Sequence, residues 1–561
     1  MSPPENASTA SPKAVSCPAW KIWANPIVRR YARSRLRPQG LALWLSLTLM
    51  LAGFIFFMAR AFSLYRGQMP VVDAERVPLL FLLVLQGIIL FFLGVGQSVS
   101  GIIAEAEEGV IDYQRLQPMS PLAKLMGFWF GLPVREWLLF ASTLPFTAWA
   151  LWRGQVPFQA WSSVYGVLIT TALMYHATAL AAGTVIKNRR SATLVSMFVL
   201  ALLYTIMPGI AKAGFIFFDH LTLWPVLNDQ YHHFIPREAG EVTRLLRLLD
   251  PQVKFYGLEF SNLFFTLVCQ AGVMLTFGMM LWRRWRRADS HLLGKAWAVG
   301  VFAWIQVLLL GNALPLIEPG SIFPSQMFRR HFRTRHFEVE PTLAEGIALI
   351  GIYGLISLLI ALVLIFLITP APEAHERGLR RAKKLALHRV PVFTDAAGAL
   401  PFVGLMIAIG AAAWTLFAQA MMSSKWFPGH ALPDHAPLVL FLVLANAMLA
   451  YHTILEGWGV KRLVICVVAI GIVPPLVGSI LATMHDSLQP LAIWLNAASP
   501  AYGPIAAAGV LVPGVEADIP LQVRRAVPLS FVFFQGLMLI VSAWLLFNLR
   551  RVHQSRRSKL G

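Results

Sequence analysis

The sequence is short of charged residues, of cysteine and of any motif that binds nucleotide phosphates. Only 13% of its 561 residues are Asp, Glu, Lys or Arg, which is too little polar surface to cover a water-soluble globule of this length. The three cysteines lie far apart, at Cys17, Cys269 and Cys466. They offer neither a disulfide framework nor a CxxC-type metal site. The pattern G-x-x-x-x-G-K-[ST] is absent, so any ATP chemistry has to come from another chain.

Long apolar stretches fill the chain instead. Hydrophobic residues make up 57% of it and the mean hydropathy is +0.64, so the solvent of most side chains is expected to be lipid. A window of membrane-spanning length predicts segments at 41–59, 78–103, 128–151, 160–186, 191–211 and 258–281, and at 295–314, 343–369, 398–420, 436–457, 463–484 and 528–549. We expect an all-α, polytopic integral membrane protein with about 12 transmembrane helices.

The basic residues predict how the chain lies in the membrane. The net charge of +20 comes from short blocks between apolar segments, which topology and anionic headgroups explain better than nucleic acid does. Most of the 47 lysines and arginines fall inside if the N-terminus is cytoplasmic. We therefore predict a multi-pass protein of the plasma or inner membrane with both termini in the cytoplasm. The block Arg329–Arg335 disagrees, because it falls in a loop predicted to be external.

The N-terminal residues 1–40 form a basic segment before the first apolar run. Apolar residues are interleaved with its charges between Trp20 and Arg37, as in an interfacial helix along the cytoplasmic leaflet. A disordered basic flank is the alternative. No apolar region precedes the basic residues, so the first span is predicted to be an uncleaved signal anchor.

The spans divide into two sets of six, residues 41–290 and the more divergent 291–561. Each set starts on the same side, which predicts two six-helix pseudo-repeats in parallel. The clearest match is a Tyr-His pair with a glycine seven residues after the histidine, at Tyr175-His176 and Gly183 and again at Tyr451-His452 and Gly459. Long stretches also follow the fifth span of each half, at about 212–257 and 485–527.

Polar residues within the spans are candidates for function, because burying them in lipid is costly. One interpretation is that His176 and His452 form a protonatable intramembrane pair across the pseudo-twofold axis and line a substrate path. The alternative is that each histidine only hydrogen-bonds a neighbouring helix. His220, His232 and His233 lack a cysteine or carboxylate at ligand spacing, so no metal site is predicted.

The segment between the second and third predicted spans carries the most specific pattern. It reads E-A-E-E-G-V-I-D-Y-Q-R-L-Q-P-M-S from Glu105 to Ser120 and reaches a glycine at Gly127. Physically this is an acidic entry, a glycine that breaks the helix, a short amphipathic turn and a proline before the next helix. Such an element is expected to lie across the membrane surface.

This pattern resembles the cytoplasmic loop of type-2 ABC transporter permeases, E-x-E-x-G-T-L-E-x-L-x-x-x-P-L-S. The resemblance implies a permease powered by a separate ABC ATPase subunit, with ATP bound by that partner and no cofactor in this chain. The implied coupling residues are Glu105, Glu107, Gly109, Asp112, Leu116, Pro118, Ser120 and Gly127. Val110 and Phe128 depart from the family pattern, which often has Thr and a basic residue there. The substrate stays unknown.

The second half resembles the family by architecture only. Glu376 and Gly378 are similar to the acidic-glycine entry and make a possible second coupling loop, but Arg381 replaces the acidic position and no proline follows at the family's spacing. If both halves are permease-like, one chain supplies the pair of units that a transporter usually assembles from two, with unequal coupling.

Two other classes remain open. Twelve spans in two parallel halves also fit a secondary transporter, although the G-x-x-x-D-R-x-G-R-R type of pattern is missing. A membrane-embedded enzyme acting on lipids or glycans would need paired carboxylates near the interface. The acidic group at 105–112 could serve it, but its spacing is explained better by coupling.

Overall fold

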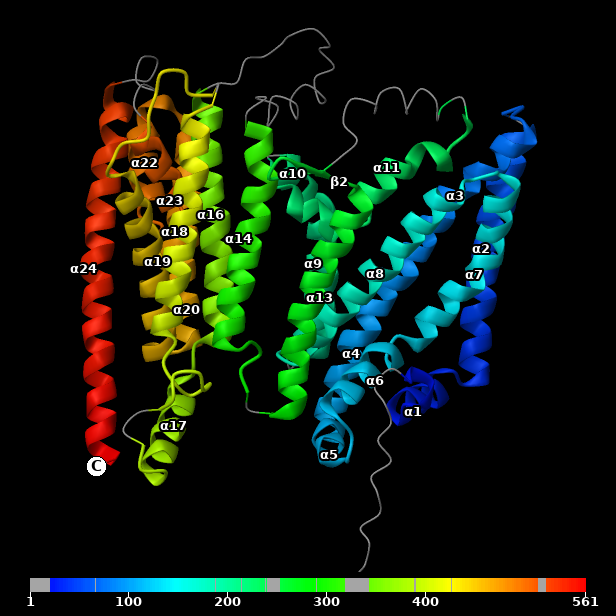
Figure 1. Cartoon of the computed structure of the whole chain (residues 1–561), viewed down its shortest axis with the longest axis horizontal. Helices are drawn as coiled ribbons and strands as arrows, with labels where there is room; N and C mark the ends of the chain where they lie inside the picture. Colours follow the sequence, from blue (N-terminus) through cyan, green and yellow to red (C-terminus); the bar gives the residue numbers. More distant parts are fainter. Residues whose placement is uncertain are drawn as a thin grey trace, which may run out of the picture. The chain divides into compact units, whose positions relative to one another are not determined.

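The computed structural model describes residues 21–560 apart from 66, 187, 213, 238, 240–252, 289, 318–342, 388–389, 425 and 513–520. Cys17, the first 20 residues and the block Arg329–Arg335 lie outside the described residues. The rest is helical (Figure 1), with one antiparallel ribbon of β1 (Val253–Phe255) and β2 (Leu258–Phe260). Tyr256 and Gly257 both have positive φ, 47° and 81°, and close its two-residue turn.

Eleven helical stretches in the described part of the chain are long and apolar enough to cross a membrane. They are Pro38–Tyr65, Val71–Glu107, Phe158–Gly183, Arg189–Ala211, Asn262–Arg286, Lys295–Ile317, Leu343–Ile368, Leu400–Met422, Ala436–Trp458, Val460–Met484 and Arg524–Ser555. Each overlaps one of the predicted spans. The chain is therefore an all-α, multi-pass membrane protein.

The predicted span at 128–151 has no counterpart among these eleven. It is divided between α6 (Pro121–Gly131) and α7 (Val134–Arg153). Pro133 stands between the two helices and has no N–H to continue the hydrogen-bond ladder. Arg135 and Glu136 then lower the hydropathy of the first turn of α7. The described residues therefore contain eleven helices of membrane-spanning length and hydropathy, not the twelve predicted.

The chain forms two compact units. Unit 1 comprises residues 1–206, 219–252 and 261–289, and unit 2 comprises 207–218, 253–260 and 290–561. The short segments 207–218 and 253–260 come from the first half of the sequence but belong to unit 2. The predicted pseudo-repeat between the halves stays a prediction.

Unit 1 is built from long helices with short elements at both ends. Its elements are η1 (Ile22–Ala24), α1 (Pro26–Arg35), α2 (Pro38–Tyr65), α3 (Val71–Gly87), the π-helical η2 (Ile88–Leu93), α4 (Gly94–Glu107), α5 (Val110–Leu116), α6, α7, α8 (Phe158–Gly183), α9 (Arg189–Thr205), α11 (Trp224–Phe234) and α13 (Asn262–Arg286). The 3-10 turn η3 (Ile216–Leu221) runs from unit 2 into unit 1. Because α3, η2 and α4 run on without a break, they form one stretch of 37 residues.

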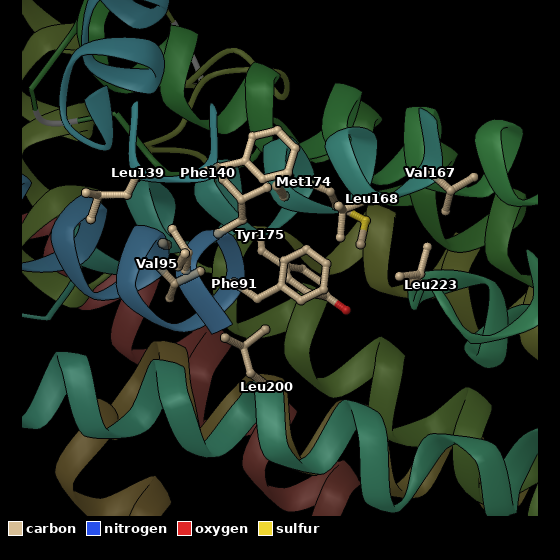
Figure 2. Packing of buried hydrophobic residues seen from close by; sticks show 14 of the residues in the cluster. Phe91, Val95, Leu139, Phe140, Val167, Leu168, Met174, Tyr175, Leu200 and Leu223 are labelled. Carbon is tan, nitrogen blue, oxygen red and sulfur yellow. The ribbon is translucent and has the colours of Figure 1, made fainter. Parts of the chain in front are cut away.

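The core of unit 1 lies where η2, α4, α7 and α8 meet. Figure 2 shows the ring of Phe91 beside that of Tyr175, with Val95, Leu168 and Leu200 around them. The two ring centroids are 5.2 Å apart in an edge-to-face arrangement, which is the geometry that aromatic quadrupoles favour. Tyr175 also donates from its hydroxyl to the carbonyl of Leu221. Part of the Tyr-His motif is therefore core packing.

Unit 2 is also mostly helical. Its elements are α10 (Met207–Lys212), β1, β2, α14 (Lys295–Ile317), α16 (Leu343–Ile368), α17 (Pro372–Lys384), α18 (Leu400–Met422), α19 (Ala436–Trp458), α20 (Val460–Cys466), the π-helical η4 (Val467–Ile472), α21 (Val473–Met484), η5 (Asp486–Leu488), α22 (Gln489–Ala497), α23 (Gly503–Leu511) and α24 (Leu521–Leu560). Its core is aromatic: Tyr353 stacks on Phe417 at 4.6 Å, and Trp414 covers Gly354 and donates to the carbonyl of Ile350.

Candidate functional site

The segment singled out by its sequence pattern forms a short surface helix, α5, between α4 and α6. Figure 1 shows it at the end of unit 1 where α1 and α6 also lie. Gly109 joins α4 to α5 with φ +70°, a left-handed conformation that strains residues with a Cβ. No heavy atom lies within 4 Å of the position where its Cβ would be. Backbone conformation, not crowding, therefore explains this glycine.

One face of α5 is exposed and mixes apolar side chains with a carboxylate. Leu116 is 85% and Tyr113 67% exposed, and the Asp112 side chain is 78% exposed. Glu107 and Glu108 are exposed at the end of α4. We call these five residues the α5 face. Large exposed apolar side chains rimmed by charge mark surfaces that bind other proteins.

The opposite side of α5 is fixed to the helices behind it. Ile111 and Gln114 are buried. Nζ of Lys124 on α6 donates to the carbonyl of Arg115 at 3.0 Å, near the C-terminal end of α5. Burial lowers the pKa of Lys124 below its ordinary value. Arg115 contacts Asp112 within α5 and donates to the carbonyl of Arg284 on α13 at 3.4 Å.

Glu105 does not belong to the exposed surface with which the sequence pattern grouped it. It is 7% exposed, and both of its carboxylate oxygens accept from the guanidinium of Arg30 on α1 at 3.0 Å. Burial and then the charge of Glu105 raise the pKa of Tyr31 well above its usual range. Glu105 therefore attaches the N-terminal helix to α4.

The glycine at the end of the pattern allows α1 to pack against α6. A Cβ at Gly127 would lie 2.7 Å from Cβ of Ile27, and one at Gly131 would lie 2.7 Å from the ring of Tyr31. Close approach at small residues spaced four apart is a common way for membrane helices to pack. Asn25 joins the same contact, since its Nδ2 donates to the carbonyl of Ala123 at 2.7 Å and its Oδ1 accepts from the N–H of Ile27.

α6 begins with a capping serine and a proline, three residues after the expected Pro118. Oγ of Ser120 accepts from the N–H of Ala123 at 3.1 Å, and Pro121 occupies the first helical position. Pro118 is exposed just before it. Behind it, Phe128 of α6 stacks on Trp285 of α13 at 4.6 Å. These contacts connect α5 firmly to the long helices of unit 1.

The N-terminal helix α1 has a buried face of Ile27, Val28 and Tyr31 and an exposed face with Arg29 and Arg33. Residues 26–35 are therefore helical, and the alternative of a disordered flank is wrong for them. Asn25 followed by Pro26 is a helix-start signal that could have predicted this helix from the sequence. The ion pair between Arg30 and Glu105 could not be predicted from the sequence, because the two residues are 75 positions apart.

The possible second coupling loop takes a different form. Glu376 and Gly378 lie within α17, which has 13 residues against 7 in α5. A Cβ at Gly378 would lie 2.4 Å from Cβ of Ala396, so this glycine allows close packing instead of breaking a helix. The exposed face of α17 is basic, with Arg377, Arg380, Arg381, Lys383 and Lys384.

The two intramembrane histidines each have local partners. Nε2 of His176 lies 2.9 Å from the carbonyl oxygen of Leu90, which belongs to the π-helical η2, and a Cβ at Gly94 would lie 2.3 Å from the same nitrogen. His452 contacts Glu456 at 2.9 Å and Thr369 at 3.1 Å. His176 belongs to unit 1 and His452 to unit 2. These contacts support hydrogen bonding to neighbouring helices.

No group of His, Cys, Asp and Glu able to hold a metal ion occurs among the described residues. His220 is buried with its Nδ1 2.7 Å from the hydroxyl of Thr266, and burial lowers its pKa to about 3.

Comparison of the chain with protein-family models, with curated proteins and with solved structures gives no match.

Proposed function

We propose that this protein is the membrane-spanning permease of an ABC-type exporter, powered by a separate ATP-binding subunit that docks on the α5 face. The observation that carries the proposal is the combination of an exposed Leu116 and Tyr113 with a rigid attachment behind them. A partner that pushes on this face moves α6 and α13 with it. The spans then need no ATP site of their own.

The attachment suggests how such a push is transmitted. Lys124 joins the end of α5 to α6, and Arg115 joins it to α13. On the other side, the Arg30–Glu105 pair couples α1 to α4. A displacement of α5 therefore reaches α6 and α13 directly. In this proposal α5, α1 and both termini are cytoplasmic, the membrane is the plasma or inner membrane, and α1 lies against its lipid headgroups.

The second unit offers a different docking surface in this proposal. The basic α17 cannot replace the acidic and apolar α5 face, because its exposed side chains carry the opposite charge. The two units of one chain therefore couple unequally to the ATPase.

The test is recovery of an ATPase with the tagged full-length protein from its native membrane. Wild-type protein should co-purify with a partner protein that contains a phosphate-binding loop and has ATPase activity. Leu116→Arg should reduce both at least about tenfold, because a charge replaces the most exposed apolar anchor of the docking face. Leu258→Arg is the matched control, since Leu258 is 62% exposed on β2 and should have no effect.

Two outcomes would overturn the proposal. The first is that wild type and Leu116→Arg recover the same ATPase activity. The second is transport in proteoliposomes that is driven by an ion gradient without any ATPase, which would make the protein a secondary transporter.

A further inference from the structure

Unit 2 buries a cluster of ionisable side chains where α17 meets α19 and α24. Glu456 of α19 is 2% exposed. Its Oε2 lies 2.9 Å from Nε2 of His452, and its Oε1 lies 3.5 Å from Nε2 of His553 on α24. The ring of His553 stacks on that of His375 on α17 at 4.5 Å. Three imidazoles from three helices thus gather around one carboxylate.

The other charged groups near the cluster are fixed separately. From α14, Nζ of Lys295 donates to four carbonyl oxygens of the loop 391–398, at 2.5 to 3.4 Å. Within that loop, Asp395 accepts from the N–H of His291 at 3.3 Å. Beside His375 and His553 in the sequence, the charged residues of α17 and α24 are Glu373, Glu376, Arg377, Arg550 and Arg551. Glu456 is the one buried carboxylate that faces the imidazoles within the described residues.

The partners of the rings determine where protons sit. A carbonyl oxygen only accepts, so Nδ1 of His375, 2.8 Å from the carbonyl of Ala396, carries a proton. The hydroxyl of Thr369 donates to the carbonyl of Ile365 at 2.7 Å, so its oxygen accepts from Nδ1 of His452. A neutral His452 would then direct the lone pair of Nε2 at the carboxylate of Glu456. One proton between the two removes that repulsion.

We propose that Glu456, His452, His553 and His375 form a proton-binding site that controls how firmly α17 is held against α19 and α24. The first proton lies between His452 and Glu456 and favours the docked arrangement. Further protons go to the stacked rings of His553 and His375. The carboxylate is already paired, so these two like charges at 4.5 Å repel each other and release α17.

The direction of the response follows from this arrangement. Imidazoles gain charge as the pH falls from about 8 to about 5, so α17 is docked at the upper end of this range and released at the lower end. Unit 1 supplies an internal reference. The side-chain contacts that fix α5 are the hydrogen bond from Lys124 to the carbonyl of Arg115 and the hydrogen bond from Arg115 to the carbonyl of Arg284, neither of which contains an imidazole. This inference does not depend on the proposed export function.

Hydrogen exchange of the full-length protein in lipid nanodiscs tests the proposal. After correction for the intrinsic effect of pH, amides of 372–384 should exchange about tenfold faster at about pH 5.5 than at about pH 8. Amides of 110–116 should change less than about twofold over the same range. An equal response of the two segments, or none in 372–384, would overturn the proposal.

Two substitutions remove the titrating rings and keep their donors. His375→Asn retains an N–H near the carbonyl of Ala396, and His553→Gln retains one that reaches Glu456. Together they should abolish the pH response of 372–384, and His553→Gln alone should reduce it. His485→Asn, at an exposed histidine after α21, is the control and should leave the response intact. A pH response that persists in the double variant would contradict the proposed site, whereas protection of α19 reports whether the variant is folded.

Discussion

The two units carry surface helices that differ in charge and in attachment. α5 exposes an aspartate, a tyrosine and a leucine, and hydrogen bonds from Lys124 and Arg115 to backbone carbonyls hold it against α6 and α13. α17 exposes a row of arginines and lysines, and its buried side rests on a histidine ring and on Leu379. The two units therefore present surfaces of opposite charge.

This difference bears on what can bind. A partner with two identical docking sites cannot meet both surfaces equally well, because one repels the charge that the other attracts. The contrast also separates two kinds of attachment. Contacts made by guanidinium and ammonium groups persist across the physiological pH range, while contacts made by imidazole change within it.

The largest expected effect concerns the two buried lysines. Lys295→Met leaves four carbonyl oxygens of the loop 391–398 without their donor and should lower the free energy of unfolding by about 3 kcal/mol. Lys124→Met removes the donor of one carbonyl and should cost about 1 kcal/mol. Melting temperatures in one detergent would check this order. Equal losses would show that the carbonyl contacts of Lys295 do not stabilise unit 2.

The next effect concerns the glycines behind each surface helix. Gly127→Ala and Gly378→Ala place a Cβ 2.7 Å from Ile27 and 2.4 Å from Ala396, and each should destabilise its unit by about 2 kcal/mol. Gly166→Ala and Gly404→Ala are matched controls in long helices with open space around them. They should leave the melting temperature unchanged or raise it. If Gly127→Ala and Gly378→Ala were no more destabilising than the two controls, the helices would not be closely packed at Gly127 and Gly378.

Charge reversal compares the two surfaces directly. Asp112→Arg should lower the amount of co-purified ATPase about tenfold, whereas Arg380→Glu on α17 should change it by less than about twofold. Melting temperatures of both variants should match wild type, because both side chains are exposed. If Arg380→Glu had the larger effect, the second unit would be the main docking surface.

The smallest effect is expected at the N-terminal helix. Arg30→Ala leaves Glu105 without its bidentate partner, but the Arg30 side chain is 45% exposed, so the loss should be about 1 kcal/mol. Faster hydrogen exchange in residues 26–35 would report it. Arg33→Ala, at an exposed position on the same helix, should leave exchange unchanged. The same exchange rate in both variants would mean that the ion pair does not hold α1.

The sequence predicted where helices lie and where they break, but it did not predict contacts between residues far apart in the chain. Membrane-spanning length and hydropathy predicted the eleven long helices, and Gly109 and Pro118 marked the break after α4 and the approach to the next helix. The division of 128–151 was missed, because a hydropathy window averages over Pro133 and its charged neighbours. The same averaging hid the short helices α22 and α23.

The candidate site was predicted as a segment but not in its detail. The pattern was matched by spacing alone, and spacing does not show which side chains face outward. Glu105 turns inward because an arginine 75 residues earlier meets it. Gly127 was part of the predicted pattern, but its close contact with Ile27 exists only because α1 packs against α6. Such contacts between distant residues arise only in the folded chain.

The contact of α1 with α4 and α6 also dictates an order of events during synthesis. Residues 25–35 leave the ribosome first, but Glu105, Ala123 and Gly127 follow roughly 100 residues later, which takes on the order of 5–20 s. Until then the amphipathic helix has no protein surface to cover its Ile27, Val28 and Tyr31 side chains. The nascent chain must shelter them in the membrane surface or with a chaperone, and α1 reaches its final contacts only after α4 and α6 have been made.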